Sequence, residues 1–431
     1  MTKRSHGEGG IDERGENVFR LRWRANGRRC AKTFRGTKAE ARKELRSLVG
    51  AVDTGGHVDP SKLTVSVWID QWIEAGAPGR RKKKVGQRTL ERYTELLNTH
   101  VKPAIGERPL QQLRAPEIDK LYAGLEGKIA PRTAHHVHVV LGAALATAHR
   151  KQMIAANPMA HVEQVPNPDR QVSEEAGDDD LGEGLDEKEL AALVAGFRPS
   201  ASMFAPVAVD AATGLRRNEL LALRWSDLNE ETKKVRIERA LEQTKKFGIR
   251  VKPPKTKRGF RTIDLDDGTI GILLAERSRY QRLMAGIPDG VDVDLSLVRL
   301  PAGALIFPAL PEPGAPIDLS TPRNPRNFSK EFARRAEVIG FGRVRFHDLR
   351  GVHATALLDA GIPVHRVAER IGDDPAVVLR NYAKRKRAKQ ADESLSNPWP
   401  RLPVVFSAPD PFGSISGPSS HCVRSRPRLS A

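Results

Sequence analysis

Apolar and basic residues alternate between residues 16 and 36, ENVFRLRWRANGRRCAKTFRG. The apolar positions are Phe19, Leu21 and Trp23, and the basic positions between them are Arg20, Arg22 and Arg24. A period of two places the two sets on opposite faces of a strand, and Asn26–Gly27 is a favoured turn pair. The pattern therefore predicts a hairpin with one cationic face. Thr37 precedes a helical stripe and is a suitable cap, so a helix is expected next.

Residues 62 to 163 show a helical period throughout, as in APEIDKLYAGL, where Ile118, Leu121, Tyr122 and Leu125 share one face. The loop GRRKKK interrupts this pattern with adjacent cations, Arg80, Arg81, Lys82, Lys83 and Lys84. His135, His136 and His138 lie on the last predicted helix, but no carboxylate or cysteine stands at ligand spacing nearby. We therefore expect solvated histidines there and no metal site.

Residues 164 to 184 are rich in Pro, Gly and acidic residues, with almost no apolar ones, which is typical of a linker. From 185 to 390 helical and strand patterns mix, with a helix entered at Asp186 and a basic strand region from Val235 to Leu265. Beyond 391 the composition favours disorder. The pattern indicates several domains, which fits a length of 431 residues.

Charge narrows the function classes. Lys and Arg outnumber Asp and Glu by 72 to 53, giving a net charge of +19, which favours a polyanionic partner. No apolar run is long enough to span a membrane, and the N-terminus lacks the apolar centre of a secretory signal. The two cysteines, Cys30 and Cys422, suggest neither disulfides nor zinc, so a cytoplasmic protein that binds nucleic acid is expected.

Three segments of the mixed region carry the candidate chemistry: TGLRRNELLALRWSDL, PPKTKRGFRTIDL and RFHDLRGVHATALLDAG. With the later IGDDPAVVLRNYAK they supply Arg216, Lys255, His347, Arg350 and Tyr382. Two guanidinium groups can neutralise the non-bridging oxygens of a phosphodiester. Lysine and histidine can move protons, and a tyrosine can supply an oxygen nucleophile. This set can cleave a phosphodiester without a metal.

The same segments resemble the catalytic domain of the tyrosine recombinases, the phage integrase family. Its boxes are T-G-L-R-x-x-E-L, a hairpin lysine, H-x-x-R, and L-G-H with a tyrosine nine residues later. From Arg350 to the position of the second family histidine is 23 residues (373 − 350), and from there to Tyr382 is 9 (382 − 373). The other three tyrosines, Tyr93, Tyr122 and Tyr280, lie on apolar stripes, which favours core packing for them.

The chain departs from the family at Asp373, where a histidine or tryptophan normally donates a hydrogen bond to phosphate. An ionised carboxylate can only accept, so Asp373 is either protonated or orients Arg350 or His347. Asp374, followed by Pro375, fits a helix cap. The hairpin lysine is best matched by Lys255, with Lys252 and Lys257 as close rivals.

The resemblance implies a multidomain fold class with three parts: a small α+β arm-binding domain (1–60), an all-α core-binding domain (61–163) and a mixed α+β tyrosine-recombinase catalytic domain (185–390). It implies an integrase that cuts and rejoins DNA through a 3′-phosphotyrosine, with Glu219 and Asp373 in supporting roles and no cofactor. The expected DNA contacts are Arg20, Arg22, Arg24, Arg80, Arg81, Lys82 and Lys83.

The implied partners are double-stranded DNA attachment sites and a homotetramer on DNA, with an excisionase and a DNA-bending host protein as further candidates. No membrane partner is expected. Two alternatives remain: a catalytically impaired DNA-binding relative, supported by Asp373, and a recombinase that resolves chromosome dimers. A type IB topoisomerase would share the chemistry, but the TGLRRNEL box favours recombination.

Overall fold

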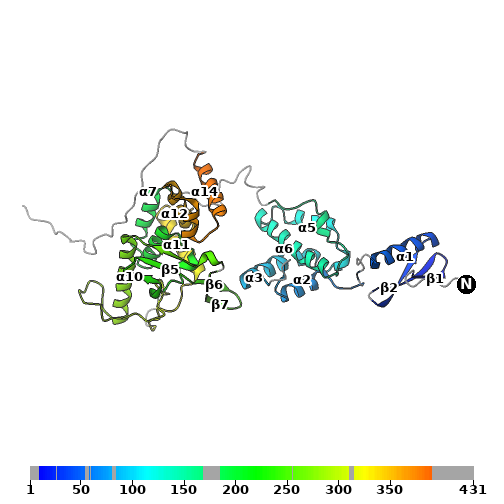
Figure 1. Cartoon of the computed structure of the whole chain (residues 1–431), viewed down its shortest axis with the longest axis horizontal. Coiled ribbons are helices and arrows are strands. Elements are labelled where there is room, and N and C mark those ends of the chain that lie inside the picture. Colours follow the sequence, from blue (N-terminus) through cyan, green and yellow to red (C-terminus); the bar gives the residue numbers. More distant parts are fainter. Residues whose placement is uncertain are drawn as a thin grey trace, which may run out of the picture. The chain divides into compact units, whose positions relative to one another are not determined.

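The computed structural model describes residues 9–25, 27–53, 58, 60–79, 84–167, 185–254, 256–309 and 315–390. The chain divides into two compact units near Gly177, and Figure 1 shows the helices and strands of both. Some expectations fall outside the described residues: Lys255, the loop cations Arg80, Arg81, Lys82 and Lys83, residues 168–184 of the linker, and the tail from 391.

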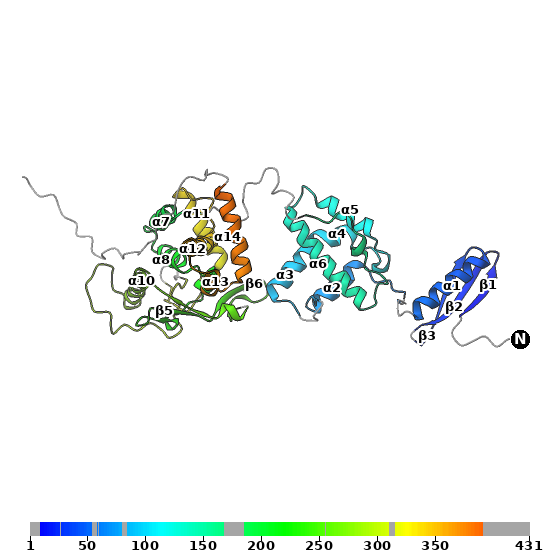
Figure 2. The same ribbon diagram turned by 45° about the horizontal axis from the view of Figure 1, so that its top comes forward.

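The N-terminal part is a three-stranded antiparallel sheet with one helix. The strands β1 (Gly10–Gly15), β2 (Val18–Ala25) and β3 (Arg28–Arg35) pair in the order β1-β2-β3, and α1 (Lys38–Asp53) lies against the sheet (Figure 2). The predicted hairpin is β2 and β3, whereas β1 was not predicted. Thr37 caps α1, since the Glu40 backbone N–H donates to its Oγ1 at 3.3 Å.

Alternation along β2 separates its two faces as expected. Phe19, Leu21 and Trp23 are buried against α1, where Leu45 completes a small core. The basic residues between them are exposed.

The described residues of the segment from 62 to 163 form helices, as predicted, with one isolated bridge between Thr64 and Pro109. Its elements are α2 (Val65–Glu74), α3 (Gln87–Leu96), the π-helical segment η1 (Leu97–Val101), α4 (Lys102–Ile105), η2 (Leu110–Gln112), α5 (Ala115–Leu125), α6 (Pro131–Arg150) and η3 (Pro158–His161). Trp68 and Trp72 of α2 and Leu141 of α6 lie in one apolar core. Pro131 occupies the first turn of α6, where a missing N–H is harmless.

The mixed region begins with α7 (Glu187–Gly196), whose cap is Asp186 as expected. A three-stranded sheet in the order β4-β5-β8 and a two-stranded sheet of β6 and β7 are flanked by helices. The strands are β4 (Leu228–Asn229), β5 (Lys234–Ile237), β6 (Ala240–Thr244), β7 (Gly248–Lys252) and β8 (Arg261–Asp264). The remaining elements are α8 (Phe204–Thr213), α9 (Arg217–Leu220), η4 (Trp225–Asp227), η5 (Lys257–Gly259), α10 (Asp267–Ala285), α11 (Pro325–Val338), α12 (Asp348–Asp359), α13 (Val364–Ile371) and α14 (Pro375–Gln390).

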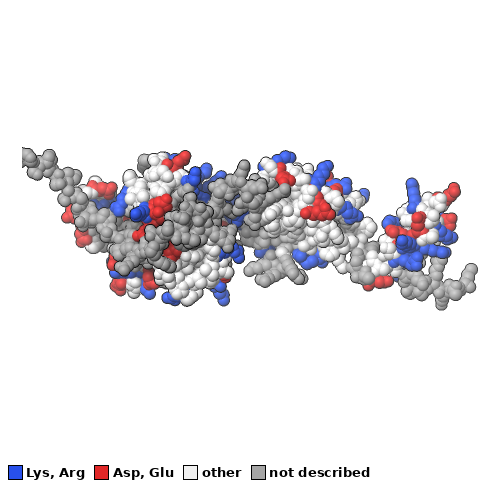
Figure 3. Space-filling model, turned by 90° about the horizontal axis from the view of Figure 1, so that it is seen from above, with Lys and Arg blue, Asp and Glu red and all other residues white. Residues whose placement is uncertain are grey.

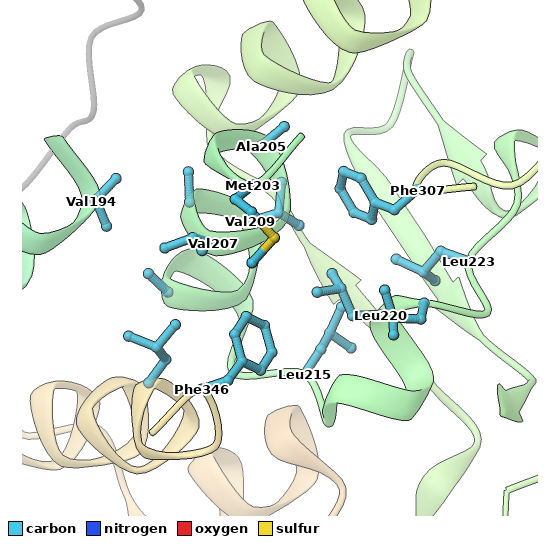
Figure 4. Packing of buried hydrophobic residues seen from close by; sticks show 14 of the residues in the cluster. Val194, Met203, Ala205, Val207, Val209, Leu215, Leu220, Leu223, Phe307 and Phe346 are labelled. Atoms are coloured by element: carbon cyan, nitrogen blue, oxygen red, sulfur yellow. The ribbon is translucent and has the colours of Figure 1, made fainter. Parts of the chain in front are cut away.

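A large apolar cluster packs the helices from α7 to α12 against the sheet, and a smaller cluster with Ala354, Val367 and Val378 joins α12, α13 and α14. Figure 4 shows part of the large cluster, in which Val207 and Val209 of α8, Leu220 of α9, and Leu223, Phe307 and Phe346 pack together. Leu215 and Leu349, which directly precede Arg216 and Arg350, belong to the large cluster, so the backbone on which both arginines stand is held by packing. No helix among the described residues is long and apolar enough to cross a membrane.

Candidate active site

Arg216 is positioned by the turn between α8 and α9. Gly214 ends α8 with φ +62°, and a Cβ there would lie 2.7 Å from His353, so glycine is required. Arg216 then occupies the cap position of α9, as predicted. Its Nη1 donates to Glu219 Oε1 at 3.0 Å, and its Nη2 donates to the Gly372 carbonyl at 2.8 Å. Both contacts aim the guanidinium group at the turn after α13.

Arg350 is a deeply buried cation, with 4% of its surface exposed. Its Nη1 donates to the carbonyl oxygens of Gly214 at 2.8 Å and Ile371 at 2.7 Å, which ties α12 to the two turns beside it. Burial, and then the charge of Arg216, lower the pKa of Arg350 to about 10. The group therefore remains a cation at neutral pH.

Asp373 places its carboxylate between these two arginines. Its Oδ2 accepts from Arg350 Nη2 at 3.0 Å and lies 3.5 Å from Arg216 Nη2. Its Oδ1 accepts the backbone N–H of Asp374 at 3.1 Å. We expected Asp373 to be protonated or to orient Arg350 or His347, and in the structure it contacts Arg350. The two guanidinium groups thus converge on one anionic oxygen.

Asp374 caps α14, the helix that carries the predicted nucleophile. Its Oδ1 accepts the Ala376 backbone N–H at 3.0 Å, and Pro375 is the first residue of the helix, as expected for this cap. Asp374 also forms an ion pair with Arg258. The Arg258 bond, and then the cap bond, lower the pKa of the Asp374 carboxyl.

Tyr382 and His347 line the same cavity as Arg350 and Asp373, a pocket of about 240 Å³ that runs along α12. The Tyr382 hydroxyl donates to Asp359 Oδ1 at 2.8 Å. Burial, and then the bond to Asp359, raise the pKa of Tyr382 to about 12. Asp359 follows Arg350 by nine residues (359 − 350) on α12, a rise of roughly 13 Å. The phenol is thus held toward the far end of the pocket from Arg350.

His347 directly precedes α12, so it shares the pocket with Arg350 without being part of the helix, a small correction to the expected helical pair. Its side chain is exposed at the rim. Partial desolvation, and then the charge of Arg350, lower the pKa of His347. The neutral imidazole is therefore the dominant form at neutral pH.

Lys252, one rival of Lys255 for the role of hairpin lysine, is engaged elsewhere. Its Nζ donates to Glu242 Oε1 at 2.9 Å, and Arg250 pairs with the same carboxylate. The other rival, Lys257, begins the turn η5 and is exposed. Lys252 is thus the weaker of the two rivals.

Three functional candidates escaped the sequence reasoning. Arg261 is buried against Glu219, Asp359 binds the Tyr382 hydroxyl, and His353 packs against Gly214. Arg261 and His353 stand within the quoted motif segments, but nothing in their spacing shows which residue each one contacts. Asp359 could have been suspected only as a carboxylate on the HDLR helix.

The expected DNA contacts of the N-terminal sheet lie on its open face. Arg20, Arg22 and Arg24 of β2 are exposed, and the register places Arg29 of β3 opposite Arg24. Arg29 was not predicted. Arg22 also pairs with Asp12 at 2.7 Å. Figure 3 shows Lys and Arg side chains gathered on this small part of the molecule.

His135, His136 and His138 of α6 are half-buried and have packing roles, whereas the sequence had led us to expect solvated histidines. His138 Nδ1 lies 3.1 Å from the Tyr122 hydroxyl, and His135 Nδ1 lies 2.9 Å from the Pro166 carbonyl oxygen. Among the described residues, no group of three or more His, Cys, Asp or Glu side chains is arranged to hold a metal ion.

Comparison with known proteins points to the tyrosine recombinases, the family that the motif segments resemble. Residues 66–165 match the family model described as the phage integrase central domain. An integrase of Streptomyces ambofaciens is 25% identical over 410 residues, which cover 89% of this chain and 94% of that protein. A tyrosine recombinase described as XerC-like, from Caldanaerobacter subterraneus subsp. tengcongensis, is 29% identical over 179 residues, covering 39% of this chain and 42% of that protein.

Solved structures share the fold at lower identity. The integrase of transposon Tn1549, in complex with transposon right end DNA, has a TM-score of 0.56 at 16% identity and covers 76% of this chain and 98% of that one. A lambda integrase dimer bound to a COC′ core site has a TM-score of 0.51 at 16% identity, covering 94% and 100%. The fold is thus that of the integrases. The family model and the curated relatives support a tyrosine site-specific recombinase of the integrase type.

Proposed function

We propose that Tyr382 attacks the scissile phosphate of a DNA attachment site, with Arg216 and Arg350 as the groups that bind that phosphate. The observation that carries this proposal is the convergence of both guanidinium groups on one oxygen of Asp373, at 3.0 and 3.5 Å. Asp373 and Arg350 line the same pocket as Tyr382. A site that holds one anionic oxygen between two arginines suits a phosphate.

The chemistry follows from the charges of the residues. The Tyr382 oxygen forms a bond to phosphorus, the bond from phosphorus to the 5′-oxygen breaks, and a 3′-phosphotyrosine and a free 5′-hydroxyl result. Two cations stabilise the negative charge that grows on the non-bridging oxygens. Because the ester link retains the phosphodiester energy, rejoining needs no ATP.

Protons must move at both ends of this reaction. The pKa of Tyr382, about 12, keeps its phenol protonated at neutral pH, so the proton leaves as the bond to phosphorus forms. The neutral His347 at the pocket rim is suited to exchange a proton or donate to phosphate. Lys255 is assigned the proton donated to the 5′-oxygen, by its place before the turn η5 and β8.

The other parts of the chain are assigned to DNA binding. The open face of the N-terminal sheet carries Arg20, Arg22 and Arg24 and would bind arm-type sites, and the helical part from 61 to 163 would bind the core site. A homotetramer on DNA and integration of a mobile element complete the proposal. The lambda and Tn1549 integrases that share the fold were solved in complex with DNA.

A nicked core-site duplex tests the nucleophile, with the core sequence taken from the repeats that flank the integrated element. The nick lets the 5′-hydroxyl fragment diffuse away, so that the covalent protein–DNA adduct accumulates. Tyr382→Phe should abolish the adduct and leave core-site binding within a few-fold, because the phenol oxygen reacts but adds little affinity. Covalent adduct in the Tyr382→Phe protein would refute the assignment.

Removal of residues 1 to 60 tests the division of labour. The shortened protein should still cleave an isolated core site but lose recombination of a full attachment site. A chromosome-dimer resolvase would not need an arm-binding sheet, so unchanged recombination in the shortened protein would favour that alternative. A wild-type protein that binds but never cleaves the nicked duplex would favour the catalytically impaired relative, which Asp373 suggests.

A further inference from the structure

Arg261, the first residue of β8, is a buried cation that contacts three separate segments. Its side chain is 6% exposed. Its Nη2 donates to Glu219 Oε2 at 2.8 Å, its Nε to the Arg370 carbonyl at 2.7 Å, and its Nη1 to the Gly259 carbonyl at 3.2 Å. One guanidinium group thus joins α9, the end of α13 and the turn η5.

The contact with Glu219 connects Arg261 to the phosphate-binding Arg216. Glu219, whose side chain is 4% exposed, receives Arg261 on Oε2 and Arg216 Nη1 on Oε1. Its Oε2 also accepts the Arg216 backbone N–H at 3.2 Å. Because one carboxylate is shared by two cations, Glu219 orients Arg216 without neutralising it fully.

The contact with α13 connects Arg261 to the turn that meets both Arg216 and Arg350. The residues after Arg370 supply the Ile371 carbonyl to Arg350 and the Gly372 carbonyl to Arg216. Gly372 has φ +69°, and a Cβ there would lie 2.9 Å from Arg261 Nη1. The turn therefore sits directly on the Arg261 guanidinium group.

We propose that Arg261 is a positioning residue for catalysis: it fixes Glu219 and the 370–373 turn so that Arg216 and Arg350 converge on one phosphate. This inference rests on the proposed function of those two arginines. Arg261 itself does not line the pocket and is not assigned a contact with DNA. Through its bonds to Gly259 of η5 and to Glu219, Arg261 also connects the segment that follows Lys255 to the TGLR segment.

The charge state of Glu219 gives the proposal a signature that a purely structural residue lacks. Burial raises the pKa of Glu219, but the bond and charge of Arg261 and the charge of Arg216 outweigh it and lower that pKa overall. Other charged groups that act in this region are Arg350 on α12 and the buried Asp210 on α8. Without Arg261 the Glu219 pKa should rise.

Two substitutions at Arg261 separate its charge from its geometry. Arg261→Lys keeps the charge but cannot reach three acceptors at once, and Arg261→Met removes the charge. Single-turnover adduct formation on the nicked core-site duplex should slow ~10-fold in the first and ~100-fold in the second, as happens when other active-site groups lose an outer partner. Core-site affinity should stay within a few-fold, because the Arg261 side chain is buried and is not assigned a contact with DNA.

Stability needs its own control, since breaking a buried ion pair is strongly destabilising. The matched control is Arg239→Met, which breaks the pair of Arg239 with the buried Asp227, at 2.6 Å, in the same unit. The double variant Arg261→Met with Glu219→Gln removes both buried charges, so it should regain stability yet still cleave slowly. In the pH–rate profile of cleavage, the acid limb should move to higher pH in Arg261→Met, because the Glu219 pKa rises. It should stay in place in Arg261→Lys, which keeps the charge.

The outcomes are distinct. A wild-type protein that forms no adduct, or an adduct independent of Tyr382, would defeat the proposed function itself. If the wild type cleaves through Tyr382, the inference is overturned by an Arg261→Met protein that cleaves within about three-fold of wild type. It is also overturned if that protein slows only as much as Arg239→Met and its acid limb does not move.

Discussion

The arginines of the N-terminal sheet and Arg350 of the pocket are the same residue type in opposite settings. On β2, Arg20 and Arg24 are exposed on an open face, and their backbone neighbours bury apolar side chains on the other face. In the pocket, Arg350 is 4% exposed and has two carbonyl partners and one carboxylate partner. The exposed side chains on the sheet can adjust their positions to a bound partner. The guanidinium group of Arg350 is held in one orientation by its hydrogen bonds.

This difference shows what each region can contribute. Exposed cations bind a phosphate backbone mainly through their charge, so their geometry matters little and their affinity falls as the salt concentration rises. Buried cations with satisfied donors have already met their desolvation cost, so their remaining N–H groups point where the fold directs them. We therefore expect that Arg→Lys substitutions on the sheet preserve DNA binding, whereas Arg350→Lys in the pocket impairs cleavage.

The largest effect should come from Arg350→Lys. Lysine cannot bind the Gly214 and Ile371 carbonyls and an anion in the same fork geometry. Single-turnover cleavage should fall ~10²–10³-fold, as is typical when one oxyanion donor is removed, while core-site affinity changes little. Cleavage within ten-fold of wild type would show that charge alone suffices in the pocket.

The next effect concerns the carboxylate that Arg350 binds. If Asp373 orients Arg350, both Asp373→Asn and Asp373→His should slow cleavage, by ~10–100-fold as for outer partners removed elsewhere. If the carboxylate instead repels the phosphate, Asp373→His should cleave faster because it removes an anion and adds a donor. Single-turnover rates decide: a faster Asp373→His protein defeats the orienting role, and unchanged rates in both variants would make Asp373 a bystander.

A smaller effect is expected on the sheet. Replacing Arg20, Arg22 and Arg24 together by Gln should weaken DNA binding by the N-terminal part and reduce its salt slope by about 0.9 for each phosphate that is no longer neutralised. The matched control, all three replaced by Lys, should keep the slope. Titrations at several salt concentrations measure it. A Lys triple variant as weak as the Gln triple variant would mean that the sheet arginines also act through fixed geometry.

The smallest effect is on stability and tests the buried side of the comparison. His353 donates from Nδ1 toward the Ala211 carbonyl and accepts from Arg370 on Nε2, and burial, then the charge of Arg370, lower its pKa to about 3. The unfolded value is about 6.5, so the stabilisation is complete above about pH 6.5 and is lost as pH falls toward about 3.

His353→Gln removes this titration, whereas His365→Gln changes an exposed residue of the same unit. Urea unfolding between about pH 6 and 4 should show a shallower pH slope in His353→Gln, by up to about 1.4 kcal/mol per pH unit. His365→Gln should retain the wild-type slope. Equal slopes in all three proteins would mean that His353 is not held neutral in the fold.

The sequence predicted those features that depend on local pattern. The hairpin after residue 16, the caps Thr37, Asp186 and Asp374, and the place of Arg216 at a helix start follow from alternation and cap chemistry, and all are present. The resemblance of the motif segments to the tyrosine recombinases implied that Arg350, Asp373 and Tyr382 share a site, and all three line one pocket.

The missed features depend on contacts between distant segments. Arg261 and Glu219 are 42 positions apart, and Tyr382 and Asp359 are 23 apart. No periodicity encodes which buried cation a carboxylate will meet, because that follows from how α9, β8 and α13 pack. The strand β1 was missed because GIDERG lacks the apolar alternation of β2 and is defined by its pairing with β2.

The most direct test of the proposed chemistry is to identify the residue that becomes joined to DNA. Wild-type protein reacted with the nicked core-site duplex is digested with trypsin and a nuclease, and the modified peptide is sequenced by mass spectrometry. Only four tyrosines occur in the chain, and Tyr122 and Tyr280 are buried. We expect a nucleotide on Tyr382 in the peptide that follows Arg380, attached through its 3′-phosphate. A nucleotide on Tyr93 or on a serine, or a 5′-phosphate link, would contradict the assignment.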